Sequence, residues 1–296
     1  MDVVTPAYRG ASTLARLLPA SVVDTAAPQL AGLTALRASD RRAMVERHQR
    51  RIDPTLSGAA LRQRVRDVYR SYGRYYGESF RLPTVSPAEL DARLTYDGYE
   101  RIEEARATGT GPLLIMPHLG SWEWAAFWLT RVRHLPVSAV VERIEPPALF
   151  DWFVAFRESI GLEIIPLGPE AGRSIVSAVR RGRAVALLSD RDITGSGVEV
   201  DFFGERTTLP SGPAVLALRT GARLLPSAVY DRGRSHHGVV RPPVPAERRG
   251  SFRDDVARIT QAIAHELEDL IRAAPEQWHL LQPNWPSDRA ARRVRL

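Results

Sequence analysis

From about residue 96 onward, short apolar runs alternate with amphipathic helical stretches, and this pattern limits the possible folds more than any other feature. The apolar runs begin at residues 112, 136, 162, 184, 198 and 222, and the helical stretches lie near 120–131, 146–159, 171–181 and 212–220. Alternation of strands and helices is typical of a parallel sheet with helices on both faces. The sequence therefore predicts an α/β fold with a central, mostly parallel sheet, followed by a long helix near Phe252 to Ala273.

The first 95 residues show a different pattern. Leucine and valine recur at near-helical spacing between residues 11 and 36, and Pro19 interrupts them, which predicts two short amphipathic helices. A longer helix with a stripe of aromatic residues is expected from Ser57 to Phe80. We expect a helical region over 1–95 and an α/β core over 96–296, together one compact domain. The first helices could pack on this core, or their apolar face and the basic residues Arg9 and Arg16 could contact an anionic membrane.

Composition narrows the range of possible partners and chemistries. The chain has 296 residues and a formal charge of +7, and all 41 of its basic residues are arginine, so partners with negative charge are expected. No nucleic-acid-binding motif accompanies this charge, so nucleic acid is not among the expected partners. Cysteine is absent, which excludes disulfides, thiolate metal ligands and cysteine nucleophiles. No secretory signal is expected, and the longest apolar runs have about six residues, far fewer than the roughly 20 of a membrane-spanning helix.

His118 stands at a position where chemistry is common in α/β proteins. It directly follows the predicted strand "LLIM", and ligands collect at the carboxyl ends of parallel strands. If His118 lies in the turn before the next helix, Glu123 on the first turns of that helix could reach it, and Gly120 supplies the flexible backbone that the turn needs. A second acid, Glu199, follows a glycine-rich turn. A carboxylate partner would make His118 a general base, although the spacing alone also fits a structural histidine.

The remaining histidines give weaker signals. No G-x-S-x-G or H-E-x-x-H motif is present to suggest a serine nucleophile or a zinc site, and no metal site is predicted. We expect surface positions for His134, His236 and His237, and helical positions for His48 and His265.

Three ordered motifs resemble a known family. "HLGSWEW" (118–124), the segment 189–226 that begins "SDRDITGSG", and "PEQWHLLQPNW" (275–285) are similar to the bacterial lipid A biosynthesis acyltransferase superfamily. The likeness is strongest to its actinobacterial branch, the phosphatidylinositol mannoside acyltransferases. It implies a glycerolipid acyltransferase-like fold at the cytoplasmic face of the cell membrane, as a peripheral protein. The implied reaction moves a long acyl group, typically palmitoyl, from acyl-CoA to a mannose hydroxyl of a phosphatidylinositol mannoside, with no other cofactor.

The resemblance also suggests roles for individual residues. His118 would be the general base, without an acyl-enzyme. The family usually has aspartate at the fifth position after this histidine, where the present chain has Glu123, and Glu199 matches the other acidic position of the branch, so either could be its partner. By match to the family, Glu142 and Arg157 would bind the polar acceptor. Arg191 would also bind substrate, because it lies in the turn "SDRD" beside the expected site. For Arg157 and Arg191, a solvated position is the alternative.

Other expectations concern the surroundings of His118. Backbone N–H groups near Gly120 and Ser121 could bind the oxyanion, and an acyl groove could be lined by Trp122, Trp124, Phe127 and Trp128, which could equally be core residues. Trp278 and Trp285 are expected to be structural. Two alternative functions stay open: another glycerolipid or lysophospholipid acyltransferase, and a catalytically silent peripheral lipid-binding protein.

Overall fold

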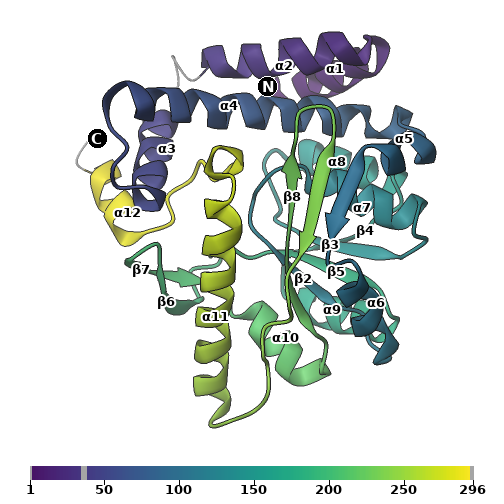
Figure 1. Ribbon diagram of the computed structural model, residues 1–296, viewed down its shortest axis with the longest axis vertical. Coiled ribbons are helices and arrows are strands. Elements are labelled where there is room, and N and C mark those ends of the chain that lie inside the picture. The colour runs from purple at the N-terminus through teal and green to yellow at the C-terminus, as the bar shows by residue number, and fades with distance from the viewer. Residues whose placement is uncertain (1, 35–38, 294–296) are drawn as a thin grey trace.

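The computed structural model describes residues 2–34 and 39–293, and within them a seven-stranded sheet forms the centre of the protein (Figure 1). Its strands, in chain order, are β1 (Leu94–Asp97), β2 (Leu113–Met116), β3 (Val137–Val141), β4 (Glu163–Pro166), β5 (Ala184–Leu188), β8 (Leu224–Asp231) and β9 (His236–Val240). The order across the sheet is β1-β9-β8-β2-β5-β3-β4. Strands β8, β2, β5, β3 and β4 are parallel, and only β9 and β1 run the other way. The prediction of a mostly parallel α/β sheet is confirmed.

Helices cover both faces of this sheet. The connecting helices are α5 (Pro87–Ala92), α6 (Glu100–Ala107), α7 (Trp122–Arg131), α8 (Pro147–Ser159), α9 (Ala171–Arg180) and α10 (Gly212–Thr220), and α11 (Phe252–Arg272) follows the last strand. One buried apolar cluster joins the sheet to α9, α10 and α11, and a second joins it to α5, α6 and α7. The central strand β2 is fully buried, which explains why it reads as a continuous apolar run.

The N-terminal part of the chain is helical, as expected. It contains α1 (Val4–Leu17), α2 (Ala20–Thr34), α3 (Ser39–Ile52), α4 (Gly58–Arg81) and the 3-10 turn η1 (Leu82–Thr84). Figure 1 shows α1 and α2 as an outer layer on α4, at one end of the molecule. The break at Pro19 is confirmed, whereas residues 35 and 36 of the predicted second helix lie outside the described residues. No helix in the described ranges has both the length and the apolar character that a membrane span requires.

The predicted strand at residue 198 does exist, but not in the central sheet. Strand β6 (Val198–Phe202) pairs antiparallel with β7 (Glu205–Leu209) in a separate two-stranded hairpin. Two residues, Phe203 and Gly204, connect them, and both have positive φ. Such a two-residue turn matches the twist of a hairpin, so β6 pairs with its neighbour in sequence and not with the distant parallel strands.

Strand β9 was not predicted, and it corrects the expectation for His236. β9 lies between β1 and β8, and His236 at its start is completely buried against the ring of Trp124, with ring centroids 4.4 Å apart. Burial lowers the pKa of His236 to about 3, so its imidazole is neutral at pH 7. The prediction of a surface histidine was therefore wrong. His237 next to it is half-buried, and His134 is exposed as expected.

Candidate active site

Two neighbouring parallel strands place His118 beside an aspartate. β2 ends at Met116 and β5 at Leu188, and these two residues are opposite each other in the register. His118 and Asp190 each stand two residues beyond the strand end, so their side chains meet at the carboxyl edge of the sheet. The His118 Nδ1–H donates to Asp190 Oδ1 over 2.6 Å, and the His118 backbone N–H donates to Oδ2 over 3.0 Å.

The environment of Asp190 keeps it charged. Burial by itself would raise the pKa of this fully buried carboxyl, but the charge of His118 and the hydrogen bonds from His118 and Trp278 outweigh it, so the pKa lies below its usual value. An ionised carboxylate fixes the proton of His118 on Nδ1 and leaves the lone pair on Nε2. The His118 side chain is 31% exposed and is part of a cavity wall.

Glu123 lies near this pair but has a different partner. It is buried on the first turn of α7, where its Oε1 accepts from Arg157 Nε at 2.8 Å and its Oε2 accepts from Ser79 Oγ at 2.7 Å. Arg157 Nη2 is also 2.8 Å from Glu123 Oε1. The expected contact between Glu123 and His118 is therefore replaced by a buried ion pair, which fixes Arg157 on α8.

Glu199 is not at the site. It points outward from the β6–β7 hairpin, its side chain is 75% exposed, and its ion-pair partner is Arg206 at 3.9 Å. Glu199 is away from His118 because β6 belongs to the separate hairpin and not to the central sheet. The acid that the structure places on His118 is Asp190, which corrects the pairing expected from the sequence.

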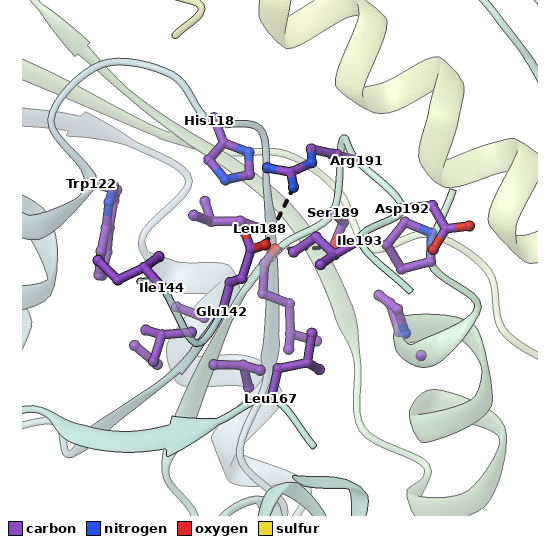
Figure 2. A pocket seen from close by; sticks show the side chains of 18 of the residues that line it. His118, Trp122, Glu142, Ile144, Leu167, Leu188, Ser189, Arg191, Asp192 and Ile193 are labelled. Atoms are coloured by element: carbon purple, nitrogen blue, oxygen red, sulfur yellow. Dashed lines mark hydrogen bonds and ion pairs between the residues drawn. The ribbon is translucent and has the colours of Figure 1, made fainter. Parts of the chain in front are cut away.

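A cavity of about 450 Å³ opens beside His118, and its wall includes Glu142, Arg157 and Arg191. Arg191 Nη2 donates to Glu142 Oε1 over 3.3 Å. In Figure 2, His118, Arg191 and Glu142 lie together, whereas Leu167 lies toward the opposite end. The volume is in the range of small-molecule sites, and a largely apolar wall with a few convergent charged groups is typical of them.

Comparisons with known proteins identify the family of this chain. The family model described as bacterial lipid A biosynthesis acyltransferase matches residues 3–287. The chain belongs to this family. It is therefore an acyltransferase.

Curated relatives have more specific names. A phosphatidylinositol mannoside acyltransferase of Mycobacterium tuberculosis is 42% identical over 232 residues, covering 76% of this chain and 72% of the relative. One of Mycolicibacterium smegmatis is 39% identical over 236 residues, covering 78% and 76%. A lipid A biosynthesis acyltransferase of Haemophilus influenzae is 27% identical over 197 residues, covering 65% and 59%.

The backbone around the acyltransferase's His118 is tightly fixed. Gly120 has φ +59°, and a Cβ there would lie 1.8 Å from the Val229 oxygen, so this turn requires glycine. The Gly120 N–H donates to Gln277 O over 3.0 Å, and the Ser121 N–H donates to Val229 O over 3.1 Å. Because these two N–H groups already have partners, they are not free to bind an oxyanion, contrary to the expectation from the sequence.

Of the four aromatic residues expected to form an acyl groove, only Trp122 lines the 450 Å³ cavity. Trp124, Phe127 and Trp128 are buried in the cluster with α5 and α6, and Trp128 Nε1 donates to Asp91 at 2.8 Å. For these three, the core interpretation holds. The aromatic stripe of α4 contributes more to the cavity, through Tyr72, Tyr75 and Tyr76.

Two site residues of the acyltransferase were missed by sequence reasoning. For Asp190 a signal existed, because it lies two residues after an apolar strand, as His118 does. His279, in the motif "PEQWHLLQPNW", lines the cavity and contacts Ser71 Oγ through Nε2 at 2.9 Å. Burial, together with the charge of His118, lowers the pKa of His279 to about 3. It therefore presents a neutral imidazole, and nothing in its sequence context distinguished it from a structural residue.

Proposed function

We propose that this acyltransferase moves a long fatty acyl group, typically palmitoyl, from acyl-CoA to a mannose hydroxyl of a phosphatidylinositol mannoside. The observation that carries the proposal is the His118–Asp190 pair, whose histidine lines the cavity. The acceptor comes from the names of the mycobacterial relatives, about 40% identical over three quarters of the chain. No resident cofactor or metal is required by this reaction.

In the proposed mechanism His118 acts as a general base. Its Nε2 takes the proton of the sugar hydroxyl while that oxygen attacks the thioester carbonyl carbon. The new C–O bond forms, the C–S bond then breaks, and the imidazolium returns its proton to the CoA thiolate. The Asp190 carboxylate, 2.6 Å from Nδ1, stabilises the imidazolium between these two steps. The acyl group passes directly between the substrates, so no acyl-enzyme forms.

The charged groups around the cavity suit a polar acceptor headgroup. Carboxylates accept hydrogen bonds from sugar hydroxyls, and guanidinium groups bind phosphate bidentately. Glu142 and Arg191 lie together beside His118. Arg157, on α8, is fixed by Glu123 on α7. We assign these three residues to acceptor binding.

The apolar side chains in the wall of the cavity suit the acyl chain. They include Leu167, Ile175 and Leu216. Each methylene removed from water stabilises the complex by about 0.8 kcal/mol, so a long chain gains much of its binding free energy from such a wall.

The acceptor is tested by direct assay. Purified protein is incubated with palmitoyl-CoA and, separately, a phosphatidylinositol mannoside or a lysophospholipid, and released CoA thiol and acylated lipid are measured. We expect transfer only to the mannosylated lipid. Transfer to the lysophospholipid instead would contradict the proposed acceptor, and binding of both lipids without transfer would indicate a silent lipid-binding protein.

The outer face of α1 and α2 supports peripheral binding at the cytoplasmic face of the cell membrane. Most of the exposed large apolar side chains of the described residues lie on or beside these two helices: Val3, Val4, Leu14, Leu17, Val22, Leu30 and Leu33. Arg9 is exposed on the same layer. An apolar helix face with basic residues is typical of helices that lie in the interface of an anionic membrane.

We expect the double substitution Leu17→Ser and Leu30→Ser to weaken binding to vesicles with anionic phospholipid at least tenfold. Burying one leucine contributes roughly 1.5–3 kcal/mol, and both residues are more than half exposed, so the fold should be unaffected. Sedimentation with the vesicles measures the effect. The matched control is Tyr96→Ser with Phe252→Ser, two exposed apolar residues elsewhere. Equal losses in the two double variants would contradict a membrane role for α1 and α2.

A further inference from the structure

Besides His118, the C-terminal segment also binds Asp190. Trp278 Nε1 donates to Asp190 Oδ2 over 2.7 Å, and Asn284 Nδ2 donates to the Asp190 backbone oxygen over 2.9 Å. Trp278, Asn284 and Asp190 are all buried, so water does not replace these donors. The tryptophan orients the carboxylate, and the asparagine fixes the backbone from which that carboxylate projects.

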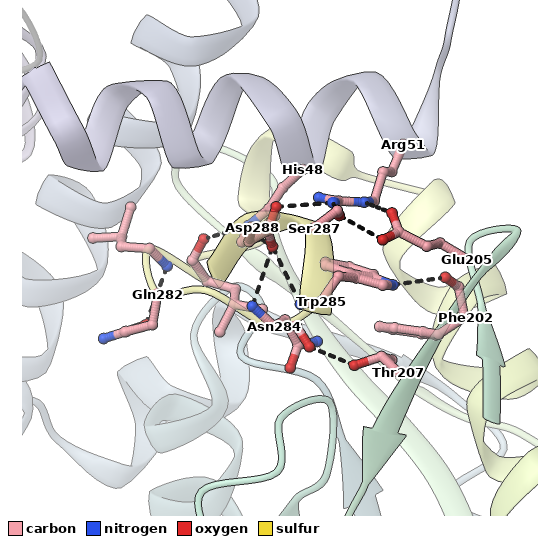
Figure 3. A network of polar contacts seen from close by, with 12 residues as sticks. His48, Arg51, Phe202, Glu205, Thr207, Gln282, Asn284, Trp285, Ser287 and Asp288 are labelled. Carbon is pink, nitrogen blue, oxygen red and sulfur yellow. Dashed lines mark hydrogen bonds and ion pairs between the residues drawn. The ribbon is translucent and has the colours of Figure 1, made fainter. Parts of the chain in front are cut away.

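Asn284 is itself fixed by a buried aspartate on α12 (Pro286–Arg293). Asp288 Oδ2 accepts the backbone N–H groups of Asn284 and Trp285, both over 3.2 Å. The Asn284 backbone oxygen accepts from Thr207 Oγ1, on β7. The turn before α12 is therefore held between Asp288 on one side and the hairpin on the other (Figure 3).

Asp288 is in turn bound to α3. His48 Nε2 lies 3.3 Å from Asp288 Oδ2, and Arg51 Nη2 donates to Oδ1 over 2.8 Å, as Figure 3 shows. Burial would raise the pKa of Asp288, but the hydrogen bond and charge of His48 and the charge of Arg51 outweigh it and hold the pKa far below its usual value. The carboxylate is therefore ionised at all ordinary pH values and accepts all of these hydrogen bonds.

The chain just after Asp190 is a surface loop. Residues 191–197 form no helix or strand, and the turn is organised by Asp192, whose Oδ2 accepts from the Gly197 N–H and from Thr208 Oγ1. A loop can shift by an ångström more easily than a strand can, and such a misplacement of a catalytic group can cost up to roughly 10²-fold in rate.

We propose that Asn284 is a positioning residue for the catalytic pair: its amide fixes the backbone of Asp190 so that the carboxylate stays aligned with His118 Nδ1. The proposal rests on the proposed function, because it assigns a role within the same His118–Asp190 pair. Asn284 does not touch the substrate. It acts only through Asp190.

The test compares two buried amides of the same kind. Asn284→Ala removes the hydrogen bond to Asp190, and Gln49→Ala removes a 2.9 Å hydrogen bond from Gln49 Nε2 to Pro275 O, in the same C-terminal segment but without a hydrogen bond to Asp190 or His118. For both variants and the wild type, kcat, thermal unfolding and the low-field proton resonance of the His118 Nδ1–H are measured. The acyl donor is palmitoyl-CoA and the acceptor is a phosphatidylinositol mannoside.

We expect Asn284→Ala to lower kcat by roughly 10- to 100-fold and to move or broaden the Nδ1–H resonance. Gln49→Ala should keep kcat within about twofold and leave that resonance in place, even if its Tm falls as much as the Tm of Asn284→Ala. If Asn284→Ala does not fold, Asn284→Leu fills the same space and removes only the polar group. Unchanged kcat and an unchanged resonance in the folded Asn284 variant would overturn the proposal.

The same assays distinguish this proposal from the proposed function. Loss of activity in His118→Ala and Asp190→Asn, with full activity in the Asn284 variant, would refute the positioning role alone. Full activity in all three variants would refute the catalytic pair itself.

Discussion

Replacing His118 by alanine is expected to lower the kcat of acyl transfer by about 10²- to 10⁴-fold, because general-base assistance typically contributes that much. The substitution removes Nε2, which we propose takes the hydroxyl proton, and it removes the group that protonates the leaving thiolate. The ring is partly exposed, so the loss of stability should be small. Release of CoA thiol and formation of the acylated lipid, measured together, give the rate, and thermal unfolding checks the fold.

The control for this experiment is His237→Ala. His237 is half-buried on β9, contacts Thr95 and Asp97, and does not line the cavity. Its loss should leave the rate of transfer unchanged. If folded His118→Ala kept more than a tenth of the wild-type rate, the general-base mechanism would be wrong.

Asp190→Asn is expected to produce a loss of similar size, on the order of 10³-fold. The buried carboxylate accepts from His118 Nδ1, His118 N and Trp278 Nε1. An asparagine amide can turn its own N–H toward Nδ1, which favours the tautomer that carries its proton on Nε2. His118 then has no lone pair toward the substrate, as happens when the aspartate of a serine protease triad is amidated.

Glu199→Gln is the matched control for Asp190→Asn, since it makes the same chemical change in an exposed acid. Its rate should stay within about twofold of wild type, because the Glu199 side chain contacts only Arg206 among the described ion pairs. The reverse result, a large loss for Glu199→Gln and none for Asp190→Asn, would favour the acid expected from the sequence over the one in the structure.

The local elements followed closely from the sequence. The strands of the α/β core at residues 113, 137, 163, 184 and 224, and helices α7 to α11, lie within a few residues of their predicted positions. These predictions depend on the spacing of apolar residues along a few turns or pleats, which is a property of neighbouring residues. The strands that were missed, β1, β7 and β9, are short and mostly half-exposed or exposed, so they lack a clear apolar pattern.

Part of the candidate site also follows from local sequence, because His118 comes shortly after a predicted strand. His118, Glu142, Arg157 and Arg191 line one cavity, and their roles there stay predictions. The acid beside His118 was not predicted correctly. Glu123 is near His118 in sequence, and Glu199 matches a motif position. In the structure, Glu123 binds Arg157 and Glu199 points to solvent.

The sequence by itself determined the α/β class, the helical N-terminal region and the histidine at a strand end. Only the tertiary structure decided which carboxylate meets that histidine. β5 lies between β2 and β3 in the sheet, although β3 and β4 come before it in the chain, and this order brings Asp190 to His118 from 72 residues away. Strand order depends on long-range packing of whole strands and helices, and no local spacing of residues records it.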